Sequence, residues 1–177
     1  MNNQRGFGLI EVTVSIYILT MGLFGLMSLL HQSLKAQDIN KNSIVAAQLA
    51  QEGIELVRNV RDNNWLDPDS SDWKIDIVDG KGGDANQAFA IDYRGRDNIQ
   101  PVSSIDDENS KLYIDVDNFY THDSSSNSPT LFSRIIEKIN SNNEYVEIIS
   151  TVKWSERGAD HDYVVATKLY NWRFASR

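Results

Sequence analysis

The sequence predicts an α+β protein, in which a long amino-terminal helix runs from a transmembrane half to an extracellular half and packs on an antiparallel β-sheet head. Residues 7–30 form an apolar run in which Glu11 is the only charged residue. Apolar side chains then recur at helical spacing through residues 31–64. After Pro68 apolar and polar residues alternate, which is the period of half-buried strands.

The apolar run is long enough to cross a membrane. Its 24 residues exceed the roughly 20 that a transmembrane helix needs and the roughly 7–15 in the apolar core of a secretory signal peptide. Arg5 is the only charge ahead of the run, which favours a cytoplasmic amino terminus and an exported head. We therefore expect a single membrane span followed by an extracytoplasmic head.

Glu11 is an anomaly in this run, because an acid at the centre of a transmembrane helix costs about 2.5–3.5 kcal/mol, and less near an end. One interpretation is that its side chain reaches the membrane interface, since Glu11 lies only a turn into the segment. The other is that it pairs with a cation from another chain, such as the free amino group of a newly cut terminus. Both interpretations remain open at this point.

The second half of the helix, residues 31–64, carries an apolar stripe wide enough to pack on a sheet. The stripe consists of Val45, Leu49, Gly53, Leu56 and Val60, with Ala46, Ala50 and Val57 beside them. A thinner strip of Ile44, Ala47 and Ile54 points nearly the opposite way. A fibre core is one surface that could cover this second strip.

The turn signals of residues 65–72 end the helix, and strands follow. Alternation predicts strands around residues 73–77, 89–93, 112–116, 146–154 and 163–169, whereas residues 131–139 suit either a strand or an amphipathic helix. Residues 79–86 and the polar stretch around Pro101 are expected to be loops. Residues 155–161 are expected to connect the last two strands as a hairpin.

Composition and spacing give no reason to expect an enzyme. The chain has no cysteine, which excludes disulfides, cysteine zinc sites and thiol nucleophiles. His122 and His161 each precede an aspartate in a polar turn, where we expect a solvated side chain. The acids Asp67, Asp69 and Asp72 lack the glycine and glutamate of a calcium loop. We expect no catalytic, cofactor or metal site.

Length and charge limit the partners. The 177 residues suit one globular domain with an appendage. Residues 1–64 contain five basic and five acidic residues, so the formal net charge of −8 lies entirely in residues 65–177. Such an acidic surface repels phosphate backbones, and we infer no specific nucleic-acid partner.

The first residues carry a motif. The run from Arg5 to Val12 reads RGFGLIEV and resembles the processing motif of type IV prepilins and pseudopilins, although Gly8 stands where Thr or Ser is common. The resemblance implies the type IV pilin fold and cleavage between Gly6 and Phe7 by a prepilin peptidase. It also implies N-methylation of the new Phe7 terminus and a role for Glu11 in filament assembly.

Two further segments extend the resemblance. Residues 151–158 and 164–173 resemble the closing hairpin of minor pilins of the type IV pilus modification family, and residues 46–62 resemble the second half of their helix. The implied organisation is a leader peptide at 1–6, a transmembrane half of the helix at 7–30, its amphipathic half at 31–64, and a β-rich head at 65–177.

The implied function is that of a minor structural subunit of a type IV pilus, held in the inner membrane before assembly and in an extracellular filament afterwards. Its partners would be prepilin peptidase, other pilin subunits and the assembly machinery. A pseudopilin of a type II secretion system shares every feature quoted. A signal-anchored extracytoplasmic binding or enzymatic domain is the third possibility, and it predicts an uncleaved amino terminus.

Overall fold

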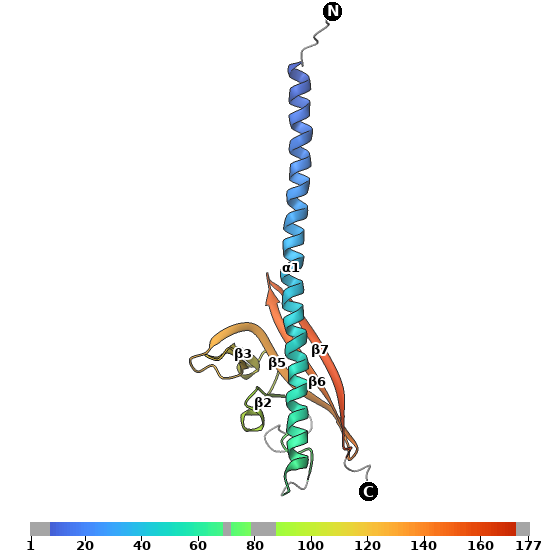
Figure 1. Ribbon diagram of the computed structural model, residues 1–177, viewed down its shortest axis with the longest axis vertical. Coiled ribbons are helices and arrows are strands. Elements are labelled where there is room, and N and C mark those ends of the chain that lie inside the picture. The colour runs from blue at the N-terminus through green and yellow to red at the C-terminus, as the bar shows by residue number, and fades with distance from the viewer. Residues whose placement is uncertain (1–7, 69–71, 79–87, 173–177) are drawn as a thin grey trace, which may run out of the picture. The chain divides into compact units, whose positions relative to one another are not determined.

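The computed structural model describes residues 8–68, 72–78 and 88–172. One long helix, α1 (Leu9–Leu66), precedes a set of strands (Figure 1). The strands are β1 (Ala88–Ala90), β2 (Gln100–Val102), β3 (Lys111–Ile114), β4 (Tyr120–Thr121), β5 (Ser128–Ser141), β6 (Tyr145–Glu156) and β7 (Ala159–Tyr170). Short 3-10 helices, η2 (Gly95–Asn98) and η3 (Glu108–Ser110), lie between them. The prediction of an α+β protein with one long apolar amino-terminal helix and an antiparallel sheet is confirmed.

The chain divides into two compact units, an amino-terminal unit (Met1–Asn42) and a globular unit (Ser43–Arg177), and α1 contributes to both. The described strands of the globular unit form one antiparallel sheet with β5 at its centre. One edge of β5 pairs with β3 and β1, and the other pairs with β6. β7 pairs with β6 along its whole length, and β2 and β4 extend β1 and β3.

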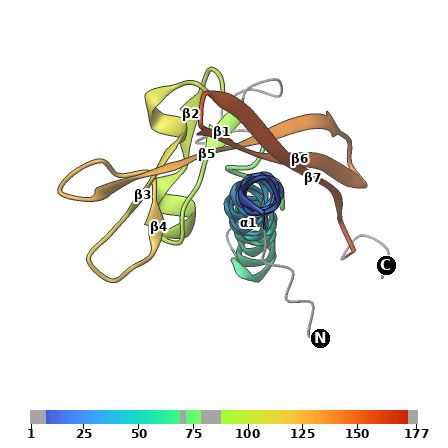
Figure 2. The same cartoon turned by 90° about the horizontal axis from the view of Figure 1, so that it is seen from above.

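Within the globular unit, α1 covers one face of β5, β6 and β7 (Figure 2). Every second residue of β6 from Val146 to Trp154 is buried on that face. The predicted apolar stripe of the helix is confirmed. Its buried members are Ala46, Leu49, Ala50, Gly53, Val57 and Val60, and Val45 and Leu56 are partly buried against the same core.

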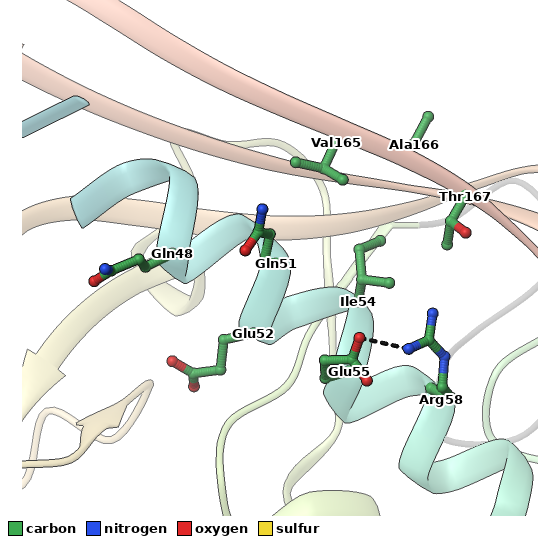
Figure 3. A pocket seen from close by; sticks show the side chains of 9 residues that line it. All are labelled: Gln48, Gln51, Glu52, Ile54, Glu55, Arg58, Val165, Ala166 and Thr167. Carbon is green, nitrogen blue, oxygen red and sulfur yellow. Dashed lines mark hydrogen bonds and ion pairs between the residues drawn. The ribbon is translucent and has the colours of Figure 1, made fainter. Parts of the chain in front are cut away.

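Ile54 departs from the expectation that it shares a second strip with Ile44 and Ala47. That prediction is wrong for Ile54, which is 4% exposed and packs in the core with Val57. Figure 3 shows its side chain between α1 and β7, on the side of Val165. Because β7 extends the sheet beyond β6, the sheet covers a wider arc of the helix than one stripe. Ile44 remains exposed.

Gly53 marks the closest approach of α1 to the sheet. A Cβ at this position would lie 2.7 Å from Ser150 Oγ and 2.9 Å from Ile136 Cδ1. Only a residue without a side chain permits this approach without a shift of the neighbours. This explains a glycine in a helix interior, where it costs about 1 kcal/mol relative to alanine.

We expect Gly53→Ala to lower the free energy of unfolding of the globular unit by about 1–2 kcal/mol, because overpacking outweighs the gain in helix propensity. Urea unfolding followed by tryptophan fluorescence measures this. Adding Ser150→Ala removes one clashing atom and should restore part of the loss. Gly25→Ala is the control, since a Cβ there has no neighbour within 4 Å. A Gly53→Ala protein as stable as the wild type would contradict the close packing.

Residues 73–77 do not form the predicted strand, and that prediction is wrong. They form turns around one bridge residue, Ile75. The side-chain amide of Asn64 in α1 donates to the carbonyl oxygens of Trp73 (3.1 Å) and Ile75 (2.7 Å). These two hydrogen bonds tie the segment to the helix, and Trp73 still enters the core.

Other predicted strands are present with shifted ends. The strand predicted around Phe89 ends at Ala90, and the one around Leu112 ends at Ile114. The strands around 146–154 and 163–169 are confirmed as β6 and β7, and residues 131–139, left open between strand and helix, lie in β5.

Two loop predictions are corrected. Pro101 was expected in a loop and instead lies in β2, at the edge of the sheet, where a residue without an N–H is tolerated. The expected connection over 155–161 shortens to Arg157 and Gly158, with φ of 53° and 80°. Positive φ at both positions suits a two-residue hairpin turn. The predicted loop at 79–86 lies outside the described residues.

Candidate functional site

The candidate site lies at the start of the chain. Gly6 and Phe7, the positions implied for cleavage and methylation, lie outside the described residues. The described segment begins at Gly8, whose carbonyl oxygen accepts the backbone N–H groups of Glu11 (3.0 Å) and Val12 (3.2 Å). These bonds close the first turn of α1, so the helix begins directly after Gly8.

Glu11 lies in this first turn, and its side chain is exposed. An acid is favourable there because unpaired backbone N–H groups and the helix dipole make a helix amino terminus positive. Among the described residues, none forms an ion pair with Glu11. The first lysine or arginine after it is Lys35, 24 residues later, which is about 36 Å along a helix.

The surface around Glu11 is apolar and exposed. Three of its hydroxyl groups donate to carbonyl oxygens of the same helix: Thr13 to Ile10 (2.9 Å), Ser15 to Glu11 (2.7 Å) and Thr20 to Tyr17 (2.9 Å). Such bonds satisfy the donors without water, as a membrane interior requires. By length and composition, α1 contains a stretch able to cross a membrane. Glu11 is the one charged side chain of residues 8–30, and it forms no ion pair among the described residues.

A groove in the globular unit is a second candidate. It lies between α1 and β7, has a volume of about 450 Å³, and is lined by Gln48, Gln51, Glu52, Ile54, Glu55, Arg58, Val165, Ala166 and Thr167 (Figure 3). The charged side chains that line the groove form ion pairs within the protein. Arg58 Nη1 lies 2.5 Å from Glu55 Oε1, and Glu52 Oε1 lies 3.4 Å from Arg134 Nη1. No hydrogen bond from the Thr167 hydroxyl to either glutamate is among the contacts of the described residues.

His122 corrects an expectation. It was expected to be a solvated turn residue, but it follows β4 and is 6% exposed. Its Nδ1 lies 3.1 Å from the carbonyl oxygen of Lys111, to which the neutral ring donates. Burial, reinforced by the charge of Arg134, lowers the pKa of His122 to about 4. The imidazole is therefore neutral at neutral pH. His161 is half-buried and stacks on Trp154, with centroids 5.2 Å apart.

Two fully buried charged residues, Asp92 and Arg134, were missed by sequence reasoning. Asp92 is fully buried and accepts hydrogen bonds from Thr121 (2.7 Å), Asn98 (2.7 Å) and Arg94 (2.9 Å). Burial alone would raise the pKa of Asp92, but these hydrogen bonds, led by that of Arg94, lower it. Arg134 is also fully buried. The alternation of β5 is the signal that could have placed Arg134 on the inner face, between Phe132 and Ile136.

The family described as the prokaryotic N-terminal methylation motif matches residues 1–27, which contain Gly6, Phe7, Glu11 and the start of α1. No curated protein and no solved structure matches the chain. The match confirms the resemblance drawn from the run Arg5 to Val12. The chain therefore carries the signature of type IV prepilins, joined to an α+β architecture that is pilin-like.

Proposed function

We propose that the chain is a minor structural subunit of a type IV pilus, cut after Gly6 and inserted in the filament through its amino-terminal helix, without enzymatic activity. The observation that supports this best is Glu11, which is exposed in the first turn of an apolar helix and has no ion-pair partner among the described residues. The amino group created at Phe7 of an adjacent subunit is a cation of the required charge.

This pairing would favour assembly. Two opposite charges about 4 Å apart interact by about 4 kcal/mol at an effective dielectric of about 20, before desolvation is subtracted. The pair forms only when subunits dock, so the cost of a carboxylate in hydrocarbon is offset in the filament and not in the free membrane pool. The charge of Glu11 then selects for assembly and for one axial register.

The proposal includes a location and partners. Before assembly the chain is a single-pass protein of the inner membrane, with its head extracytoplasmic; prepilin peptidase cuts it after Gly6, and the new Phe7 terminus is N-methylated. Afterwards it lies in an extracellular filament, in contact with other pilin subunits. The apolar stretch of α1 and the methylation motif support the membrane step.

We expect Glu11→Gln to leave membrane insertion and cleavage after Gly6 intact while reducing incorporation into filaments. The defect should be partial, because neighbouring subunits still hold a minor subunit through helix packing. The measurement is the amount of subunit in sheared filaments relative to membranes, together with mass spectrometry of the amino terminus. The mature terminus should begin at Phe7 and carry one methyl group.

Two control variants sharpen this test. Glu11→Asp keeps the charge and should incorporate better than Glu11→Gln. Glu55→Gln removes an exposed glutamate elsewhere on α1 and should behave as the wild type. Equal filament-to-membrane ratios for the wild type and Glu11→Gln would contradict the pairing and favour a side chain that reaches the membrane interface.

A pseudopilin of a type II secretion system is the second candidate. The lack of proline in residues 7–30, since all three prolines lie at Pro68, Pro101 and Pro129, suits a pseudopilin and a minor pilin equally. The genes beside this one, encoding pilus or secretion components, separate the two. An intact Met1 terminus in the mature protein would instead favour a signal-anchored domain.

A further inference from the structure

The carboxyl end of α1 borders a cavity that the proposed filament role does not use. The cavity has a volume of about 410 Å³ and is lined by Asp62, Trp65, Leu66 and Trp172. This volume lies in the range of small-molecule pockets, about 300–1,000 Å³. Leu66 is 80% exposed and Trp172 is 59% exposed. The globular unit therefore presents an aromatic and aliphatic wall to solvent.

Trp172 is held in place by its neighbours. Its ring packs at 68° against Trp65, with centroids 4.4 Å apart. Trp65 is itself buried, stacks on Trp73 at 6.0 Å, and lies 4.7 Å from the Arg61 guanidinium. The backbone N–H of Asn171 donates to the carbonyl oxygen of Glu144 (2.7 Å), which fixes the chain directly before Trp172. The indole is thus positioned but still largely open.

Asp62 supplies a hydrogen-bond acceptor beside this wall. Arg61 Nε (2.9 Å) and Nη2 (2.8 Å) both contact Asp62 Oδ1. Among the described residues none bonds to Oδ2, and the Asp62 side chain is 45% exposed. The ion pair balances its own charge. The cavity therefore offers an acceptor oxygen without a net charge that would select a cation or an anion.

We propose that this cavity binds a neutral carbohydrate. A sugar ring has a face of C–H groups, which packs on an indole such as Trp172, and a rim of hydroxyl groups, which donate to a carboxylate oxygen such as Asp62 Oδ2. Leu66 supplies the remaining apolar wall. An ammonium ion also binds aromatic rings. A bound ammonium ion would need the Asp62 carboxylate as its counter-ion, but that carboxylate already forms an ion pair with the Arg61 guanidinium.

The test uses the full-length protein in a polyoxyethylene detergent, because glycoside and phosphocholine detergents carry competing groups. Maltotriose, N,N′,N″-triacetylchitotriose, lactose and mannotriose are the neutral probes, with choline as the cationic one, and binding is measured by calorimetry and saturation-transfer NMR. We expect at least one sugar to bind with a Kd on the order of 1 mM, as its size predicts. Trp172→Ala should raise that Kd by about ten-fold or more.

Three variants identify the cause. Leu66→Glu changes an exposed position and should also weaken sugar binding without affecting the core. Asp62→Asn keeps an acceptor oxygen and should weaken it only a few-fold. Trp154→Phe removes a tryptophan from the core and should leave the Kd unchanged. The proposal is overturned if no sugar shows binding that depends on Trp172, or if choline binds more tightly than every sugar and loses that binding in Asp62→Asn.

Discussion

Arg134→Ala should lower the free energy of unfolding of the globular unit by about 3–5 kcal/mol, the largest loss that we expect from one substitution. The guanidinium joins the helix to the sheet: Nη1 donates to the carbonyl oxygen of Leu49 in α1 (2.9 Å), and Nη2 donates to that of Ile91 (2.7 Å). Nη1 also lies 3.4 Å from Glu52 Oε1. Truncation leaves a cavity and removes two hydrogen bonds between the helix and the sheet region.

The burial of this cation is itself unfavourable, which gives the test a second arm. Desolvation lowers the pKa of Arg134, and the Glu52 carboxylate opposes that effect. Arg134→Met keeps the volume and removes the charge, so it should lose clearly less stability than Arg134→Ala. Urea unfolding of the full chain in detergent micelles, followed by tryptophan fluorescence, measures both.

Lys153→Ala is the matched control for Arg134. Lys153 lies on β6, and its Nζ is 2.8 Å from Asp106 Oδ1 in an exposed ion pair. Such pairs are screened by water, so its removal should cost little. An Arg134→Ala protein that is as stable as Lys153→Ala would show that Arg134 does not connect α1 to the sheet.

The globular unit should lose up to about 3 kcal/mol of stability as the pH falls from 6.5 to about 4, because of His122. Burial, and secondly the charge of Arg134, lower the pKa of the folded imidazole to about 4 from 6.5. Between these values the unfolded chain binds a proton that the folded chain does not. The contribution of His122 to the free energy of unfolding is therefore fully present above pH 6.5 and decreases as the pH falls through this window. Below about pH 4, His122 causes no further loss.

The pH dependence of urea unfolding at pH 7, 5.5 and 4.5 tests this expectation. His122→Asn keeps a donor for the Lys111 carbonyl oxygen but does not titrate, so it should flatten the slope in this window whatever it does to stability at pH 7. His161→Asn also removes one imidazole and should keep the slope. A slope that survives His122→Asn would assign the pH dependence to another group. A further loss below about pH 4 is expected from Asp92, whose pKa is lowered.

The helices and strands that the sequence predicted well share one property: the spacing of apolar residues within each segment is enough to define it. The alternation of β6 from Val146 to Trp154 identifies its buried face without knowledge of any partner strand. The prediction of a strand failed where hydrogen bonds from a side chain remote in sequence determine the backbone conformation. At Trp73 and Ile75 the alternation is the same, but the Asn64 amide binds the carbonyl oxygens and turns form instead of a strand.

The candidate site shows the same division. Glu11 was identified from composition, since one acid in an apolar run is visible without a structure. His122 was misjudged because its neighbour Asp123 suggested a solvated turn, whereas the core around it lowers its pKa. Burial depends on which segments pack over a residue, and adjacent residues carry little information about that.

By itself, then, the sequence determined the long helix, its apolar first half, the place of Glu11 and the period of the final hairpin. The packing of distant segments brings Gly53 to Ser150, Arg134 to Leu49 across 85 residues of chain, and Trp172 to Trp65. The difference lies in how far apart along the chain the interacting residues are. Helical and strand periods arise from neighbours a few residues apart, whereas burial and side-chain pairing arise where distant segments pack, and no local pattern encodes those contacts.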